Sequence, residues 1–182
     1  MKKALYILAE MSDRDFDWLL QVGRSKAIST GTVLIHEGEP IDALYIILEG
    51  SFKVSVEALN TGAIAHLDDG EVVGEISFVD SRPPSATVTA EQDAIVWAIP
   101  RSQLAAKLSQ DITFSSHFYK ALAVFLSDRL RKTVSQLGYE KNPEYVPLTS
   151  STDEGFNPDL FGNIELAKAR LDWMLNRLKG VH

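Results

Sequence analysis

Between Gly31 and Ile99 the sequence alternates short apolar runs with turns, and this alternation limits the possible folds more than any other feature. The runs are rich in β-branched and aromatic residues, and glycine, aspartate, asparagine and proline separate them. They predict a mainly β domain with flanking helices, in which residues of about 29–100 form an antiparallel β-roll of the double-stranded β-helix or jelly-roll type. The expected strands span residues 32–35, 44–48, 52–56, 63–67, 85–90 and 94–99.

Three glycines follow acidic residues at the expected reversals between these strands. Gly38, Gly50 and Gly70 each stand where a tight turn needs a positive φ angle, which glycine adopts without steric cost. We therefore interpret them as structural residues.

Helices are expected on both sides of the roll. Ser12, followed three residues later by Asp15, is typical of a helix N-cap and predicts a short N-terminal helix that stops at Gly23. Pro100 ends the last strand, and residues 101–110 are expected to form a short helix.

A long helix is predicted from the cap residue Asp111 through Leu137, closed by Gly138. It carries two apolar stripes. One can pack on the roll, and the other can pair with a second subunit as a short coiled seam. The alternative is one wide stripe buried within a monomer. The apolar positions are Leu122, Leu126, Leu130 and Leu137, which recur with Thr133 at helical spacing, and Phe114, Phe118, Ala121 and Phe125 beside them.

The C-terminal quarter is expected to be an appendage to a domain formed by residues 1–138. Residues 139–162 contain three prolines and are predicted to be a linker, and residues 163–180 an amphipathic helix. Such a helix alone is marginal in water, so it should dock on the domain, on a dimer mate or on another protein. Docking within the same dimer is the interpretation we favour.

Composition excludes several classes of function. The chain has 182 residues, 45% of them hydrophobic, and a net charge of −7, which indicates a globular protein without a nucleic-acid or anionic-membrane surface. The absence of cysteine excludes disulfides and thiolate metal sites, and agrees with a cytoplasmic location. No apolar stretch is long enough to cross a bilayer.

The sequence also argues against an enzyme and against direct DNA binding. Its four histidines are scattered, so no metal site is expected, and no nucleophile, dinucleotide or P-loop motif is present. Acidic residues outnumber basic ones after Gly138, and this segment is too short and too proline-broken for a winged helix-turn-helix.

One segment, residues 74–88, has the composition of an anion-binding site. Gly74 lets the backbone approach a ligand closely, Glu75 offers a fixed acceptor, and Ile76 and Ser77 begin a helical turn whose free amides can face an anion. After two prolines, small residues can bring further amides and a hydroxyl to the same point, before a strand resumes. These small residues are Ser85, Ala86 and Thr87.

This segment resembles the phosphate-binding cassette of the cyclic-nucleotide-binding domain family, which occurs in catabolite activator protein and in regulatory subunits of cyclic-AMP-dependent kinase. The similarity extends to the turn glycines and covers roughly residues 13–137. It implies that Glu75 holds a ribose hydroxyl, that the cassette amides bind a cyclic phosphate, and that Thr133 on the long helix faces the base. Cyclic AMP or cyclic GMP is the implied ligand, and a homodimer through the long helix is the implied assembly.

The cassette departs from the family at one position. The arginine that pairs with the cyclic phosphate is replaced by Pro84, which should remove about 1.5–3 kcal/mol of binding free energy. Arg82 lies two residues earlier and can in principle reach back to the phosphate; otherwise it is a solvated loop charge.

Two hypotheses follow. In the first, the chain is a non-enzymatic sensor that binds a cyclic nucleotide or a related small anion and transmits binding through the long helix. In the second, which Pro84 favours, the domain has lost its ligand and serves in dimerisation or in docking to an unknown protein partner.

Overall fold

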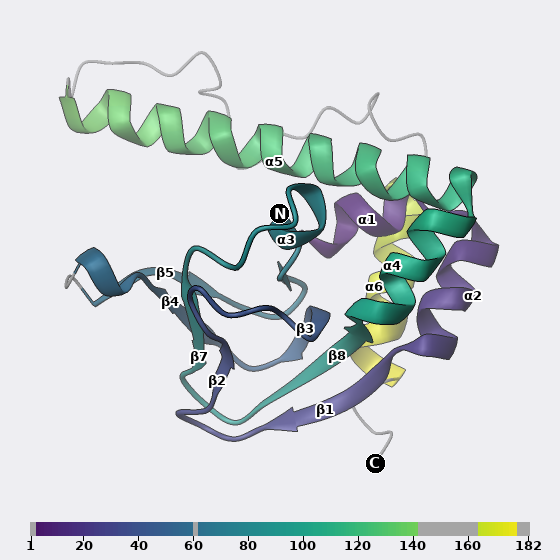
Figure 1. Ribbon diagram of the computed structural model, residues 1–182, viewed down its shortest axis with the longest axis horizontal. Helices are drawn as coiled ribbons and strands as arrows, with labels where there is room; N and C mark the ends of the chain where they lie inside the picture. The colour runs from purple at the N-terminus through teal and green to yellow at the C-terminus, as the bar shows by residue number, and fades with distance from the viewer. Residues whose placement is uncertain (1–2, 60–61, 142–163, 178–182) are drawn as a thin grey trace.

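The computed structural model describes residues 3–59, 62–141 and 164–177, without the side chains of residues 59, 132–133 and 135–141 (Figure 1). Two four-stranded antiparallel sheets form the roll, with the strand orders β1-β8-β3-β6 and β2-β7-β4-β5. The predicted antiparallel roll is therefore confirmed. The strands are β1 (Arg24–Ile28), β2 (Val33–Ile35), β3 (Ala43–Glu49), β4 (Phe52–Ser55), β5 (Ala63–Leu67), β6 (Val72–Val73), β7 (Thr87–Ala90) and β8 (Ala94–Pro100).

The six predicted strands are present, and two further strands, β1 and β6, were missed. β1 pairs with β8 along its full length, but Ile28 is its one fully buried residue, so it has little apolar pattern. β6 has only two residues, which is too short for any periodicity to show.

The glycine turns are as predicted, with φ angles of 76° at Gly38, 99° at Gly50 and 79° at Gly70. Gly50 has a second reason to be glycine. A Cβ atom there would lie 2.6 Å from the Cβ of Ala94 and 2.8 Å from its Cα, closer than real contacts allow. The turn after β3 therefore depends on a residue without a side chain.

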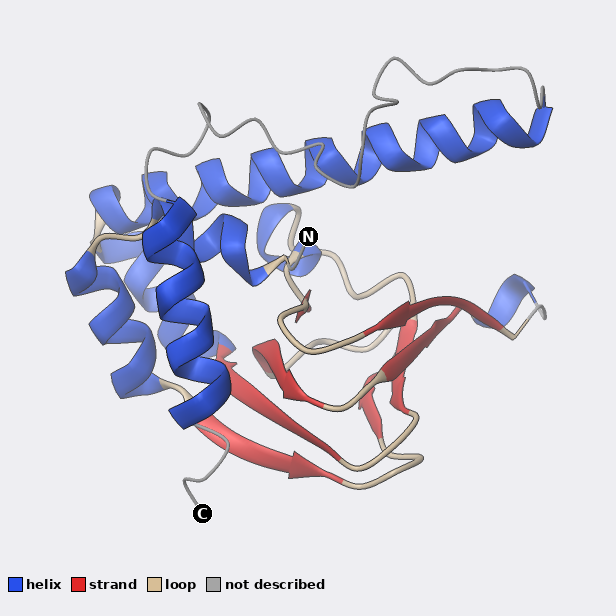
Figure 2. Cartoon of the chain, turned by 180° about the vertical axis from the view of Figure 1, so that it is seen from behind, coloured by secondary structure: helices blue, strands red, loops and turns tan. Residues whose placement is uncertain are grey.

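Helices α1, α2, α4 and α6 gather at one end of the roll, α5 extends from there along its length, and the short η1 lies at the opposite end (Figure 2). The predicted N-cap is confirmed at the start of α2, where the Ser12 hydroxyl accepts a hydrogen bond from the Asp15 amide as part of a capping box. The apolar segment that precedes the predicted helix forms a further helix, α1. The helices are α1 (Ala4–Glu10), α2 (Asp13–Val22), η1 (Glu57–Leu59), α3 (Ile76–Val79), α4 (Arg101–Gln110), α5 (Ile112–Lys141) and α6 (Ile164–Arg177).

Asp15 also links α2 to α5. Its carboxylate accepts hydrogen bonds from the Ser12 backbone and hydroxyl and contacts Nδ1 of His117 at 3.0 Å. Burial alone would raise the pKa of Asp15, but these hydrogen bonds outweigh it and hold the pKa below its usual value. The capping carboxylate thus stays ionised beside α5.

The long helix begins as predicted and ends later than predicted. Asp111 accepts a hydrogen bond from the Phe114 amide at 2.9 Å, which confirms its cap. Gly138 does not stop the helix, because α5 continues to Lys141. A glycine within a helix costs only about 1 kcal/mol relative to alanine, so it terminates a helix only where it adopts the left-handed conformation. The predicted linker beyond Lys141 lies outside the described residues.

The closing helix α6 docks on its own chain. It packs against α1 and reaches β3, burying Ala167, Leu171 and Met174. Arg170 is also buried, and its guanidinium donates hydrogen bonds to the carbonyl oxygens of Leu8 and Met11. The domain itself is one of the predicted docking partners, and α6 contacts it. None of the helices within the described ranges is both long and apolar enough to span a membrane.

Candidate ligand-binding cavity

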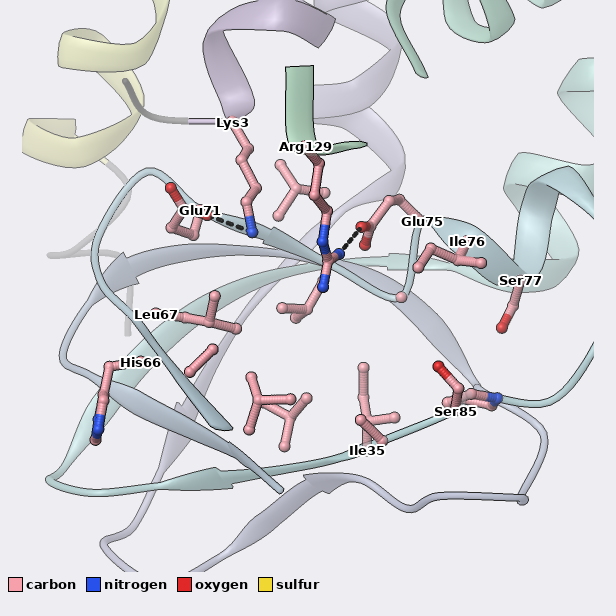
Figure 3. A pocket seen from close by; sticks show the side chains of 18 of the residues that line it. Lys3, Ile35, His66, Leu67, Glu71, Glu75, Ile76, Ser77, Ser85 and Arg129 are labelled. Carbon is pink, nitrogen blue, oxygen red and sulfur yellow. Dashed lines mark ion pairs between the residues drawn. The ribbon is translucent and has the colours of Figure 1, made fainter. Parts of the chain in front are cut away.

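A cavity of about 620 Å³ opens between the roll and α5, and the predicted cassette forms one of its walls (Figure 3). Apolar side chains of the sheet β2-β7-β4-β5 form its floor, including Ile35, Val54 and Val88. Polar and charged groups gather above them, contributed by the N-terminus, the segment before β6, the cassette and α5. These groups include Lys3, Glu71, Glu75, Ser77, Ser85 and Arg129.

Gly74 lines the cavity at the point where its backbone passes close to β3. Its φ angle is 88°, and a Cβ atom there would lie 3.1 Å from the carbonyl oxygen of Ala43 and 3.3 Å from Cδ1 of Ile41. The left-handed conformation and the tight space both favour glycine. Because the backbone turns here, the next residue, Glu75, lies on the cavity wall.

Glu75 is the most deeply buried ionisable residue of the cavity wall, with its side chain 5% exposed. Burial raises the pKa of its carboxyl group, and the nearby charges of Lys3 and Arg129 act in the opposite direction. Its Oε1 atom lies 3.5 Å from a guanidinium nitrogen of Arg129, which reaches down from α5 (Figure 3). A buried carboxylate on a cavity wall is well suited to accept hydrogen bonds from a ligand hydroxyl.

The cassette helix α3 is held from below and from above. The guanidinium of Arg101, at the start of α4, lies 4.9 Å from the ring centre of Phe78 and donates hydrogen bonds to the carbonyl oxygen of Ser77 at 3.4 and 3.5 Å. From above, the Phe118 ring of α5 packs edge-on against Phe78, with 6.3 Å between the ring centroids. The Tyr119 hydroxyl donates to the Phe78 carbonyl oxygen at 3.5 Å. The cassette is therefore in direct contact with α5.

Residues 25–111, which include the roll and the cassette, match the family model described as the cyclic nucleotide-binding domain. These residues belong to that family. The chain therefore carries a cyclic nucleotide-binding domain of the regulatory type, as the sequence resemblance indicated.

Curated relatives share the same domain. The chain is 32% identical over 89 residues to a cAMP-dependent protein kinase regulatory subunit of Yarrowia lipolytica, a match that covers 49% of this chain and 24% of the relative. It is 27% identical over 153 residues to an uncharacterized NTE family protein of Mycobacterium tuberculosis, covering 84% of this chain and 25% of that protein. The chain thus spans about a quarter of the length of these relatives.

Solved structures agree with the fold. A cyclic nucleotide-binding domain from Methylobacillus flagellatus superimposes with a TM-score of 0.63 at 24% identity, covering 79% of this chain and 83% of the other. The N-terminal domain of a transcriptional regulator from Streptomyces coelicolor superimposes with a TM-score of 0.57 at 28% identity, covering 70% and 90%.

Within this cyclic nucleotide-binding domain, most of the residues predicted for the site come together. Gly74, Glu75, Ile76, Ser77, Ser85 and Ala86 all line the cavity. Pro84, which stands at the family's arginine position, lines it as well.

Two of the other predicted residues are placed differently, and the side chain of a third is not described. Arg82 is not among the lining residues; its side chain is 83% exposed, with Nε 3.7 Å from a carboxylate oxygen of Asp80. Thr87 also lies outside the lining, and its hydroxyl accepts a hydrogen bond from the Glu37 amide at 3.1 Å. Thr133 belongs to α5, but its side chain lies outside the described residues.

Two cationic side chains that line the cavity were not predicted from the sequence. Lys3 reaches it from the N-terminus and forms an ion pair with Glu71 at 2.7 Å, and Arg129 reaches it from α5. Arg129 stands one helical turn before Thr133, and residues four apart share a helix face. Because Thr133 was expected to face the ligand, Arg129 could have been expected on the same side of the long helix. No pattern in the sequence linked Lys3 to the site.

Within the described part of the chain, no three histidine, aspartate or glutamate side chains converge in a way that could hold a metal ion.

Proposed function

We propose that this domain is a non-enzymatic sensor that binds a cyclic nucleotide or a related small anion in the cavity and transmits binding through α5. The contact between the cassette and α5 is the observation that carries this proposal. Phe118 and Tyr119 touch Phe78, and Arg129 reaches Glu75, so the cassette meets α5 at two places along the helix. A ligand that shifts the cassette therefore changes contacts that position α5.

The direct test is isothermal titration calorimetry of the protein with cyclic AMP and with cyclic GMP. We expect a saturable heat with at least one of them. If no other charge of the cavity replaces it, the loss of the family arginine at Pro84 should weaken binding by about 10- to 100-fold relative to an arginine-bearing cassette. No measurable heat with either nucleotide at millimolar concentration would rule the proposal out.

Glu75→Gln is expected to weaken binding of the same nucleotide by about tenfold or more, because a buried carboxylate that accepts a ligand hydrogen bond contributes about 1.5–3 kcal/mol. The change in affinity is measured by the same titration. Glu57→Gln is the matched control, since Glu57 is exposed and lies outside the cavity lining. Equal affinities of the Glu75→Gln variant and the wild type would show that this carboxylate does not hold the ligand.

A second candidate function, pairing of two copies through α5, is supported by the exposed face of that helix. Leu130 and Val134 stand four residues apart and are 64% and 55% exposed. Apolar residues at this spacing suit a helix seam between subunits. This pairing is compatible with a sensor and also with a domain that has lost its ligand. Pro84 supports the second of these, because it removes the arginine that would bind the phosphate.

Replacing Leu130 and Val134 together by aspartate is expected to convert a dimer into a monomer, because two charges would be buried in the seam. Light scattering coupled to gel filtration measures the mass. Ile112→Asp is the control, since Ile112 is exposed in the first turn of the same helix. A wild-type mass equal to one chain, or a doubly substituted protein that remains dimeric, would contradict pairing through this face.

A further inference from the structure

The cavity receives its permanent positive charge from outside the cassette. Among the lining residues, the lysine and arginine side chains are Lys3 and Arg129. Lys3 is engaged by Glu71 at 2.7 Å. Arg129 is carried by α5, and the two atoms of its closest contact with Glu75 are 3.5 Å apart. The position where the family places its phosphate-binding arginine is the uncharged Pro84.

We propose that Arg129 takes over the role of the missing cassette arginine and binds the anionic group of the ligand, so that the charge which holds the ligand is carried by the helix that transmits binding. This inference rests on the proposed function and names the residue and the coupling that it needs.

The geometry of Arg129 suits an exchange of partners. The contact of 3.5 Å with Glu75 is longer than the distance of about 2.7–2.9 Å typical of a strong charge-assisted pair. The Arg129 side chain is 49% exposed, so its contact with Glu75 is partly screened by solvent. A guanidinium also has five donors in a planar fork, which can bind two oxygens of a phosphate together.

The direction of the side chain supports the same role. Arg129 points from α5 into the space between Glu75 on one side and Lys3 with Glu71 on the other (Figure 3). An anionic group beneath α5 would meet the guanidinium, while a hydroxyl of the same ligand is left for the Glu75 carboxylate. One molecule with a negative charge next to a hydroxyl-bearing ring satisfies both residues.

The acidic neighbours narrow the ligand class further. Asp68, Asp69, Glu71 and Glu75 all line the cavity, so the carboxylates outnumber the two cations. A bare anion would be repelled by this surplus, whereas a nucleoside phosphate also gains from apolar contact with Val54 and Val88 and from hydrogen bonds to carboxylates. The site therefore favours a nucleoside cyclic phosphate over inorganic phosphate.

The arrangement makes binding depend on the position of α5. A cassette arginine would hold a phosphate wherever α5 lay, whereas Arg129 can do so only while α5 lies over the cavity. The ligand therefore binds the closed position of α5 with higher affinity, and this difference in affinity is the quantity that shifts the population of α5.

The test compares Arg129→Gln with wild type in calorimetric titrations of cyclic AMP and cyclic GMP. We expect the variant to bind about 10- to 100-fold more weakly, which corresponds to about 1.4–2.8 kcal/mol. Arg129→Lys should recover part of the loss. Arg82→Gln, which removes an exposed arginine of the cassette loop outside the cavity, should change the affinity less than twofold.

A second readout separates this role from a general loss of affinity. At saturating nucleotide, hydrogen exchange in the wild type should slow in both the cassette and the part of α5 around residue 129. In Arg129→Gln at saturation it should slow in the cassette alone. Unchanged affinity of Arg129→Gln, a loss in Arg82→Gln instead, or equal protection of α5 in both proteins would overturn the inference while nucleotide binding by the wild type still stood. If the wild type binds neither nucleotide, the proposed function fails, and this inference with it.

Discussion

Replacing Phe118 by alanine is expected to lower the free energy of unfolding by about 3–5 kcal/mol, the usual cost of removing a fully buried phenylalanine. Phe118 is completely buried, stacks on Phe114 with 6.2 Å between ring centroids, and meets Phe78 edge-on. Its removal leaves a cavity at the junction of α3 and α5. Urea unfolding, followed by the loss of helical circular dichroism, measures the change.

The position of Phe118 adds a functional effect to this loss of stability. Because its ring joins α5 to the cassette, any nucleotide bound by the alanine variant should protect the cassette and leave α5 unchanged. Ile112→Ala is the control from the same helix, expected to change stability by no more than about 0.5 kcal/mol because Ile112 is exposed. A loss below about 1 kcal/mol for Phe118→Ala would mean that the junction is not packed as described.

Arg170→Ala is expected to destabilise the protein by about 2–4 kcal/mol and to release α6 from the domain. The Arg170 side chain is 5% exposed, and its guanidinium donates to the carbonyl oxygens of Leu8 and Met11 and to the carboxylate of Asp13, at 2.8, 2.6 and 2.5 Å. The last carbonyls of a helix lack partners within it and carry partial negative charge, so Arg170 caps the end of α1. Without it, these buried acceptors lose their donor.

Limited proteolysis within α6, together with urea unfolding, measures the effect. Arg170→Lys should lose less stability, because the lysine ammonium group can replace some of the hydrogen bonds that the guanidinium donates. Lys168→Ala, an exposed change two residues earlier, should stay within about 0.5 kcal/mol of wild type. If Arg170→Ala resists proteolysis as the wild type does, the apolar face of α6 is sufficient to hold it in place.

The roll was predictable because its strands show their own pattern. Half-buried strands such as β7, in which the buried residues Val88 and Ala90 alternate with two threonines, produce the alternation that a sequence reveals. β1 was missed because, with Ile28 as its one buried residue, it is held in place by backbone pairing with β8. The position of β1 depends on its pairing with β8, and the local sequence of β1 does not predict that pairing.

The site was predictable to the extent that it is local in sequence. Gly74 and Glu75 belong to one short motif, and both line the cavity. Arg129 comes from a helix more than fifty residues further along, and its arrival at Glu75 depends on how α5 crosses the roll. The prediction looked for a replacement charge near Pro84 in the sequence, and Arg82 was the only arginine there.

The shortness of β6 has a consequence for the behaviour of the protein in concentrated solution. β6 and β1 are the outer strands of one sheet, and the free edge of a sheet can recruit strands from other chains and start aggregation. β6 offers only two residues for such recruitment, and β1 carries the charged residues Arg24 and Lys26. Both outer strands of the sheet that supports Gly74 are therefore poor templates for edge-to-edge association.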